Sequence, residues 1–384
     1  MRQIAYPAAV SCGWMFGNSP SVVQAAEWSA TPLYSSSFDY ASNRRLVADA
    51  HSSEAGVLTA DLRLKWALET VDMVLEPRYS FRRFSNSSLG DGDDRSLSAA
   101  FDWLRERSTL NLTASIWDQS TLFTEVLESG ILSGNTHRVL VQAGGSWVWT
   151  STERRQLIAQ LTYLDASYHG QASNLLPGYR YPFGSFGERF FHSERGSITV
   201  SAYGSALSSE TAGNSSHEYG IRAEVIHSFT ERTHVDASLG KSARRLAGES
   251  SHGTDAAFTL AHDLTFGSVS FKYTRSLVPY GTGFLAERQQ FTASLARPLT
   301  PFLDGNLSIT RVENNQLAVL LNLDRRRYDS ITTGLTWHPA ETWTVSGQLA
   351  VLRTQAPGLS DESVHDVHSV VTLTWSPLPH SRSR

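Results

Sequence analysis

Segments in which apolar and polar residues alternate recur through the sequence from about residue 31 to its end. Residues 303–312, for example, read LDGNLSITRV, with a polar residue at every second position from Asp304 to Thr310. A β-strand has a two-residue period, so each such segment folds into a ribbon with one apolar and one polar face. The sequence therefore predicts an all-β protein, and the open question is which face of the ribbons points inward.

The number and length of these segments constrain the architecture. A tilted strand needs about nine to eleven residues to cross a bilayer, and most of the segments have about that length. We assign eighteen strands, at residues 31–41, 56–66, 70–82, 96–104, 108–117, 136–149, 156–168, 179–191, 196–206, 217–228, 232–243, 254–264, 267–276, 286–297, 302–312, 327–337, 342–352 and 366–375.

The connections between the predicted strands alternate between short and long. Even-numbered strands are followed by brief links such as ALE (67–69) and RER (105–107), and odd-numbered strands by longer polar stretches such as RRLAGESSHG (244–253). Short periplasmic turns and longer external loops are typical of outer-membrane barrels, which also favour an even strand number. A soluble sandwich has Greek-key connections and no reason for this sorting. We therefore predict a transmembrane, antiparallel, up-and-down β-barrel of about eighteen strands.

Seven of the ten tryptophans fall at strand ends on the side of the short links. Indole rings favour the boundary between membrane and water, where outer-membrane barrels carry an aromatic girdle. If Trp merely favoured strand ends, it would occur at both rims about equally; Trp117 is the clear exception to the pattern. We predict a periplasmic aromatic girdle that consists of Trp66, Trp103, Trp147, Trp149, Trp337, Trp343 and Trp375.

Charged residues occupy the polar face near the centres of many strands. A charge that faces lipid near the bilayer centre costs about 2–4 kcal/mol, so in a membrane barrel this face must contact water. In a soluble protein the charged row would simply be the exterior, and the alternation alone does not exclude that alternative. Eighteen strands enclose a lumen too wide for side chains to fill, which leaves an aqueous channel unless something plugs it. The candidates for the channel lining are Arg63, Lys65, Asp72, Glu76, Arg78, Arg82, Asp102, Arg222, Glu224, Lys272, Asp304 and Asn306.

The long connection at residues 118–135 differs from the others. It reads DQSTLFTEVLESGILSGN, with apolar residues at helical spacing and Gly130 placed to end a helix. We expect a short helix that folds into or over the channel as a constriction; an exposed loop with a helical turn is the alternative. The constriction candidates are Leu122, Phe123, Glu125, Val126 and Glu128.

The two ends of the chain are expected to lie outside the barrel. Arg2, an apolar stretch and the small residues around Ala25 predict a secretory signal peptide at residues 1–25, which contains Cys12, the only cysteine. The barrel is then expected at residues 26–376, with Trp375 as its closing aromatic, followed by a disordered tail at residues 377–384. The predicted location is the outer membrane of a Gram-negative cell.

No motif in the sequence points to catalysis, a cofactor or a metal. The formal net charge is −4, which leaves no basic excess for binding nucleic acid, and no long apolar run marks a membrane helix. The thirteen histidines are scattered, and the nearest pair, His365 and His368, falls on opposite faces of a strand. We therefore expect no enzyme activity, no cofactor and no metal site.

Four hairpins share one style, a polar turn followed by a strand with small hydroxyl residues: RERSTLNLTASIWD, TERTHVDASLGKS, RPLTPFLDGNLSITR and HPAETWTVSGQLAVL. In this style the chain resembles the outer-membrane β-barrel family that is found with exopolysaccharide operons and the PEP-CTERM system. The resemblance spans the predicted mature chain and supplies no catalytic residues. It implies passage of a secreted polysaccharide through the outer membrane, with periplasmic and inner-membrane export proteins as partners.

The leading hypothesis is a passive outer-membrane channel that exports an exopolysaccharide, because a wall of mixed charge suits a hydrated sugar polymer. Such a wall suits a general diffusion porin for small hydrophilic solutes equally well, which is the second hypothesis. The third is a structural or adhesive surface barrel that acts through its external loops. The other expected partners are outer-membrane lipid and lipopolysaccharide, with no nucleic acid.

Overall fold

The computed structural model describes residues 27–47, 49, 51–85, 89–125, 136–171, 173–210, 215–246, 249–281, 283–316, 325–356, 360–378 and 380–383. Within these ranges the chain is almost entirely β-strand, as its alternating pattern predicts, and its helices are the single turns α1 (Thr121–Thr124) and η2 (Ser173–Leu175). The strands are β1 (Glu27–Ala41), β2 (Ser53–Ala67), β3 (Val71–Phe84), β4 (Gly92–Arg105), β5 (Ser108–Ser120), β6 (Thr136–Thr152), β7 (Arg155–Gly170), β8 (Tyr179–Ser193), β9 (Gly196–Ser209), β10 (Ser215–Thr230), β11 (Thr233–Leu246), β12 (Glu249–Leu264), β13 (Gly267–Pro279), β14 (Leu285–Thr300), β15 (Leu303–Gln316), β16 (Arg325–Ala340), β17 (Trp343–Ala356), β18 (Ser360–Trp375) and β19 (His380–Ser383).

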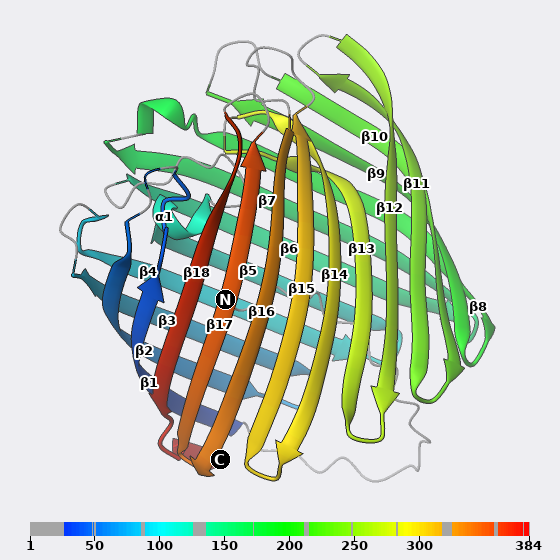
Figure 1. The fold of residues 1–384 in the computed structure, drawn as a ribbon. Coiled ribbons are helices and arrows are strands. Elements are labelled where there is room, and N and C mark those ends of the chain that lie inside the picture. The colour runs from blue at the N-terminus through cyan, green and yellow to red at the C-terminus, as the bar shows by residue number, and fades with distance from the viewer. Residues whose placement is uncertain are drawn as a thin grey trace.

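Each strand from β1 to β18 pairs antiparallel with its neighbours in sequence order, and β1 also pairs with β18, from Tyr34 opposite Trp375 to Ala41 opposite His368. The sheet is therefore a closed barrel of eighteen strands, shown from the side in Figure 1. Closure gives each of these eighteen strands a partner on both sides along most of its length, so most of their backbone groups are satisfied within the sheet; β12 and β13 separate toward their loop ends. The predicted fold class is confirmed, and each of the eighteen predicted segments overlaps one of the strands β1–β18.

The short connections lie together at one end of the barrel, the lower end in Figure 1, which we call the turn end; the opposite end is the loop end. The predicted sorting of short links is thereby confirmed. The polar stretches at the loop end are shorter than predicted, because many of their residues continue the strands. In the stretch 244–253, for example, β11 runs to Leu246 and β12 begins at Glu249, with Arg244 paired to Ser251. Backbone pairing needs no apolar face, so a strand can extend beyond the end of its apolar row.

The two faces of the barrel differ as the alternation predicts. On β2, Ala55, Val57 and Thr59 are buried on the inner face, whereas Leu58 on the outer face is 61% exposed. The inner row continues through Arg63, and large apolar side chains such as Leu64 stand exposed on the outer row. The exterior is therefore extensively apolar, the reverse of the arrangement in a water-soluble protein. No helix among the described residues is long and apolar enough to cross a membrane.

All seven predicted girdle tryptophans lie toward the turn end on outer-facing strand positions. Two of them stack on each other, with the ring centroids of Trp343 and Trp375 6.2 Å apart, and Tyr34 stacks on Trp375 at 5.7 Å. Trp28, which is the register partner of Trp66, adds an eighth ring that the sequence reading placed before the first strand.

The chain ends differ in part from the expectation. Residues 377–384 were expected to form a disordered tail, but His380–Ser383 form the short strand β19, which pairs with Glu27–Ala30 beside the end of β18. The reason is that β1 begins at Glu27, four residues earlier than predicted, whereas β18 pairs with it only from Tyr34 onward. The first residues of β1 therefore have backbone groups on that side that β18 does not reach, and β19 pairs with them. The predicted signal peptide at residues 1–25 lies outside the described residues.

Candidate functional site in the barrel lumen

Opposite charges face each other across β2 and β3 on the inner face of the barrel. They make three ion pairs between nitrogen and oxygen: Lys65–Asp72 at 3.7 Å, Arg63–Glu76 at 3.3 Å and Arg78–Asp61 at 3.5 Å. Such partly exposed pairs contribute at most about 1 kcal/mol each to stability. Their main effect is to give this part of the inner wall charges of both signs in contact with the lumen.

The other predicted lining residues are spread around the same inner face. Lys272 on β13 is the register partner of Thr259 and Thr292, and Asn306 on β15 lies two residues from Asp304. The remaining contacts are Arg82–Asp94 at 3.0 Å, Asn111–Asp102 at 2.5 Å, Arg222–Asp255 at 3.7 Å, Arg189–Glu224 at 3.9 Å and His338–Asp304 at 3.6 Å. Most of the predicted residues thus belong to charge pairs along the inner wall, and the set does not converge on one point.

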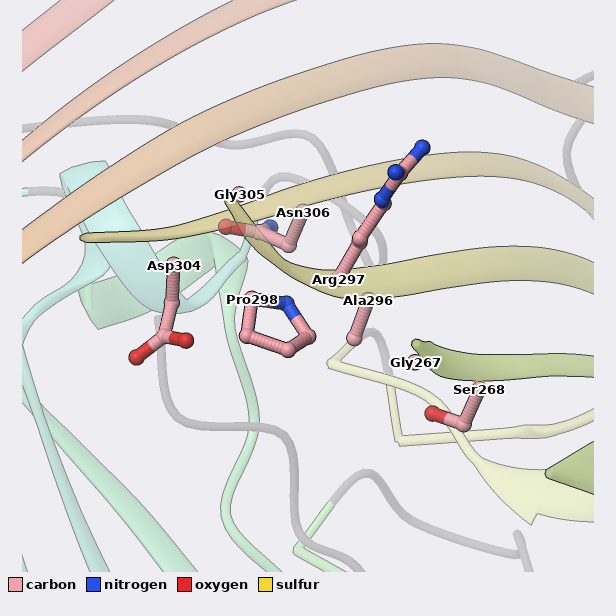
Figure 2. A pocket seen from close by; sticks show the side chains of 8 residues that line it. All are labelled: Gly267, Ser268, Ala296, Arg297, Pro298, Asp304, Gly305 and Asn306. Atoms are coloured by element: carbon pink, nitrogen blue, oxygen red, sulfur yellow. The ribbon is translucent and has the colours of Figure 1, made fainter. Parts of the chain in front are cut away.

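A shallow hollow at the turn end is shown in Figure 2, between the β12–β13 turn and strands β14 and β15. Its lining includes Ser268, Arg297, Asp304 and Asn306. In Figure 2 the side chains of Arg297 and Asp304 extend in opposite directions. They therefore do not form a common binding site for one ligand, and we assign the hollow no function.

The segment that follows β5 turns into the barrel at its loop end. Ser120 caps the single turn α1, accepting a hydrogen bond from the Leu122 amide at 3.3 Å. Leu122 is 1% exposed and packs against Ala55 and Phe84, which stand on the inner faces of β2 and β3. The described part of the predicted constriction segment is therefore folded against the inner wall.

Phe123 and Glu125 tie the same segment to the walls on either side. The ring of Phe123 stacks on Phe84 at 6.5 Å between centroids, and the guanidinium of Arg82 lies 3.8 Å from its centroid. Glu125 is fully buried; its carboxylate lies 3.2 Å from Arg138 on β6 and accepts a hydrogen bond from the Tyr168 hydroxyl on β7 at 3.0 Å. Residues 121–125 therefore span from β2–β3 to β6–β7. Val126 and Glu128 lie outside the described residues.

A second element, which the sequence reading did not anticipate, is the loop end of the β13–β14 hairpin. Strands β12 and β13 pair only from Ala256 opposite Arg275 down to Leu264 opposite Gly267, so their ends toward the loops are unpaired with each other. In Figure 1 the two strands diverge above that point. Beyond Arg275 the hairpin leaves the wall and bends into the lumen; we call its described residues, 276–281 and 283–286, the hairpin tip.

Apolar packing fixes the hairpin tip against the opposite strands. Leu277 continues the outer row of β13, yet it is only 6% exposed. The bend of the tip into the lumen places this side chain in an apolar cluster with residues of β8 and β9. A side chain on Gly283, which has a φ of +78°, would collide with Ser209 and Pro177, so the tip reaches the loop ends of β8 and β9. The apolar cluster consists of Ala166, Tyr179, Tyr181, Leu207, Leu277 and Leu285.

Arg244 links the hairpin to the inner wall of β11 and β12. Its side chain is 2% exposed, and its nitrogens lie 2.8 Å from Glu218, 3.1 Å from Asp255 and 3.5 Å from Glu287. Glu287 stands on β14 at the base of the hairpin tip and also pairs with Arg275 at 3.0 Å. Burial of a charged group is costly unless it is paired and hydrogen-bonded. Here the guanidinium and the three carboxylates compensate each other's charge.

A third buried polar group lies where the barrel closes. The Asp39 carboxylate on β1 lies 2.6 Å from both Arg44 and His368. The Arg44 guanidinium also stands 5.5 Å from the centroid of Phe84 and 5.4 Å from that of Phe123. The β1–β2 connection, which the sequence reading placed outside the barrel, therefore also contributes a buried side chain to the interior next to α1.

The sequence reading missed Arg244 and the hairpin tip for identifiable reasons. Arg244 belongs to a polar stretch that was assigned to an external loop. The tip, SLVPYGTGFLA at residues 276–286, has apolar residues on both faces, which breaks the alternation of a strand with one wet side. That break is the one signal in the sequence that could have indicated an element buried on both sides.

Comparison with solved structures shows that the barrel has a porin fold. The BenF-like porin from Pseudomonas fluorescens Pf-5 has a TM-score of 0.53 and 10% identity, over 91% of this chain and 98% of that chain. Pseudomonas aeruginosa OccK9 (OpdG) has 0.52 and 14%, over 92% and 98%, and P. aeruginosa OccK2 (OpdF), solved in complex with glucuronate, has 0.50 and 10%, over 91% and 98%. Neither protein-family models nor curated protein sequences gave a match.

The expectation of an exopolysaccharide export channel is wrong. This barrel resembles the BenF-like porin, and OccK2 with its bound glucuronate, along almost its whole length, and these neighbours fit the second hypothesis, a diffusion channel for small solutes, better than polysaccharide export. The physical reason for the error is that a charged inner wall suits either permeant, whereas passage of a polymer also needs a wide lumen. Here α1 and the hairpin tip occupy part of the lumen. The resemblance to the exopolysaccharide-associated family stays a prediction.

Proposed function

We propose that this chain is an outer-membrane diffusion channel for small hydrophilic solutes. The support for a membrane location is the outer face, where exposed side chains such as Leu58, Phe186 and Leu239 form an apolar exterior. The tryptophans of the turn end would lie at the periplasmic interface, and the loop end would face the outside of a Gram-negative cell. Membrane lipid and lipopolysaccharide would then surround the barrel.

The paired charges of the inner wall would line an aqueous path. Acidic and basic groups face each other across β2 and β3, so a solute that moves along this wall meets both donors and acceptors of hydrogen bonds. A wall of this kind favours hydrated, polar solutes and excludes apolar ones, because the charged groups retain their water. The proposed lining is the set of twelve residues predicted from the sequence.

The observation that carries the proposal is the pair of in-folded elements at the loop end. Residues 121–125 and the hairpin tip enter from different sides of the barrel, and each is anchored by apolar packing and by a buried ion pair, which in the hairpin is made by Glu287 at the base of the tip. We infer that together they act as the constriction, which would set an upper limit on solute size. The glucuronate bound to the P. aeruginosa neighbour is a solute of the small class that we propose here.

Reconstitution into liposomes would test the function. Vesicles that contain the refolded protein should swell in isotonic solutions of a monosaccharide, more slowly in a disaccharide, and hardly at all in a long oligosaccharide. The same protein should give discrete conductance steps in a planar bilayer. Vesicles without protein provide the control. A barrel that produces neither swelling nor conductance would instead be a structural or adhesive protein, and free entry of long oligosaccharides would refute the constriction.

A further inference from the structure

Three potential metal ligands meet on neighbouring strands at the loop end. Asp118 stands on β5, His137 on β6 and His169 on β7, and the two histidines are direct register partners. An oxygen of Asp118 lies 3.1 Å from Nδ1 of His137 and 3.9 Å from Nε2 of His169. The imidazole rings stack with centroids 5.5 Å apart. This set is the one group of three His, Cys, Asp or Glu side chains with metal-ligand spacing in the part of the chain that the structure describes.

The cluster faces away from the lumen. Asp118 belongs to the same row of β5 as the exposed Ile116, and His137 to the same row of β6 as the exposed Val141. His169 follows the row of Leu161 on β7 in the same way. These rows form the apolar exterior nearer the turn end, so the cluster is a polar patch at the upper edge of that exterior and is separate from the channel lining.

The donor atoms suit a divalent transition metal. Zinc binds imidazole nitrogen at about 2.0–2.1 Å and carboxylate oxygen at about 2.0–2.2 Å, which places tetrahedral ligand atoms about 3.4 Å from one another. The ligand atoms of the three residues all lie within 4.8 Å of one another. Small rotations of these partly exposed side chains would therefore bring them to bonding distance. Two nitrogen donors disfavour calcium and magnesium, which prefer sites built only from oxygen.

One nearby cation could oppose the binding of a metal. Arg95 on β4 is the register partner of Asp118. Its guanidinium is already held by Asp93, at 2.8 Å from Nε and 2.5 Å from Nη2. The Asp118 carboxylate is directed instead toward His137, with which it shares a hydrogen bond, so two of the three ligands are already held beside each other.

We propose that Asp118, His137 and His169 bind one zinc-type divalent cation on the outer surface of the barrel. The ion would join the loop ends of β5, β6 and β7 directly beside Ser120, where the chain turns into the lumen. Three protein ligands leave at least one coordination position for water or for an anionic oxygen from the surroundings. The proposal does not depend on what the barrel transports.

Titration of the full-length protein in detergent micelles with zinc chloride, followed by calorimetry, tests the site. The protein should bind one equivalent with a defined affinity, and calcium chloride should give no comparable signal. The double variant His137→Ala/His169→Ala and the single variant Asp118→Asn should each weaken binding at least about tenfold. The matched control is His192→Ala/His227→Ala, which removes another stacked pair of histidine rings, 6.1 Å apart, on β8 and β10.

Cobalt provides a second readout, because its visible absorption reports the ligand set directly. Absorption bands of a four-coordinate site should appear in the parent protein and in the control variant, and disappear in the double variant. Equal loss of zinc binding in the control and in the double variant would overturn the proposal, as would unchanged binding by Asp118→Asn. That variant keeps the size of the side chain, so it decides the matter even if the double variant does not fold.

Discussion

Replacement of Arg244 by methionine tests whether buried ion pairs hold the hairpin tip in the lumen. The guanidinium is almost fully buried and lies within 3.5 Å of three carboxylates, which belong to Glu218, Asp255 and Glu287. Removing one partner of a buried ion pair costs about 3–5 kcal/mol, because the other charge remains without compensation. Here each carboxylate keeps a second partner: Ser242 for Glu218, Tyr203 for Asp255 and Arg275 for Glu287. We therefore expect a loss near the lower limit, about 3 kcal/mol.

Urea unfolding in lipid vesicles, followed by tryptophan fluorescence, gives the free energy of unfolding for this comparison. Arg245→Met is the matched control, because the neighbouring arginine is exposed and should cost less than about 0.5 kcal/mol. Adding Glu287→Gln to Arg244→Met should recover part of the loss, since it removes one of the buried negative charges that lost their compensation. A loss below about 1 kcal/mol for Arg244→Met, or an equal loss for Arg245→Met, would refute the reasoning.

The remaining predictions concern the outer face, the constriction and the charged wall. Ala99→Arg places a charge on the outer face of β4 and should cost about 2–4 kcal/mol in a bilayer, whereas Ala100→Arg on the inner face should cost much less; equal costs in the same urea titration would contradict the assignment of faces. Phe123→Ala removes the ring between Arg82 and Phe84 and should raise single-channel conductance while costing about 3 kcal/mol of stability. Glu76→Gln leaves an unbalanced arginine on the inner wall, so the reversal potential in a salt gradient should shift toward anion preference; an unchanged potential would exclude Glu76 from the conducting path.

The strands of this barrel could be predicted from the sequence because each depends on a local pattern. In LRLKW at residues 62–66, the alternation of leucine or tryptophan with arginine or lysine specifies the strand, its two faces and, through Trp66, the turn end. The same pattern repeats along the chain, and antiparallel neighbours joined by short turns leave little choice of topology. The closed barrel follows from these local facts.

The contents of the lumen could not be predicted in the same way. The alternation indicates which face of a strand a residue occupies. It does not indicate whether the whole strand remains paired in the barrel wall or bends into the lumen. Leu277 belongs to the outer row of β13 by count and is nevertheless buried inside, because β13 separates from β12 beyond Arg275. The partners of Arg244 lie on β10, β12 and β14, and such contacts between distant segments leave no local signal.

The choice of permeant depended on those same unpredicted contacts. The charged residues of β2 and β3 lie on the inner face, but their chemistry suits a sugar polymer and a small solute alike. The difference lies in the width of the path, which residues 121–125 and the hairpin tip reduce. The group formed by Asp118, His137 and His169 was missed for a related reason, since its members come from three strands and are separated by 19 or more positions in the sequence.

Shortening the β13–β14 hairpin tests the proposed constriction most directly. Residues 278–286 are replaced by Asn-Gly, a favoured two-residue turn, so that Leu277 and Glu287 become the last pair of the hairpin. We predict a higher single-channel conductance than that of the parent protein and swelling of liposomes in sugars that the parent excludes. A variant that folds into the barrel and retains both the parent conductance and the parent size limit would contradict the proposal that the hairpin tip narrows the channel.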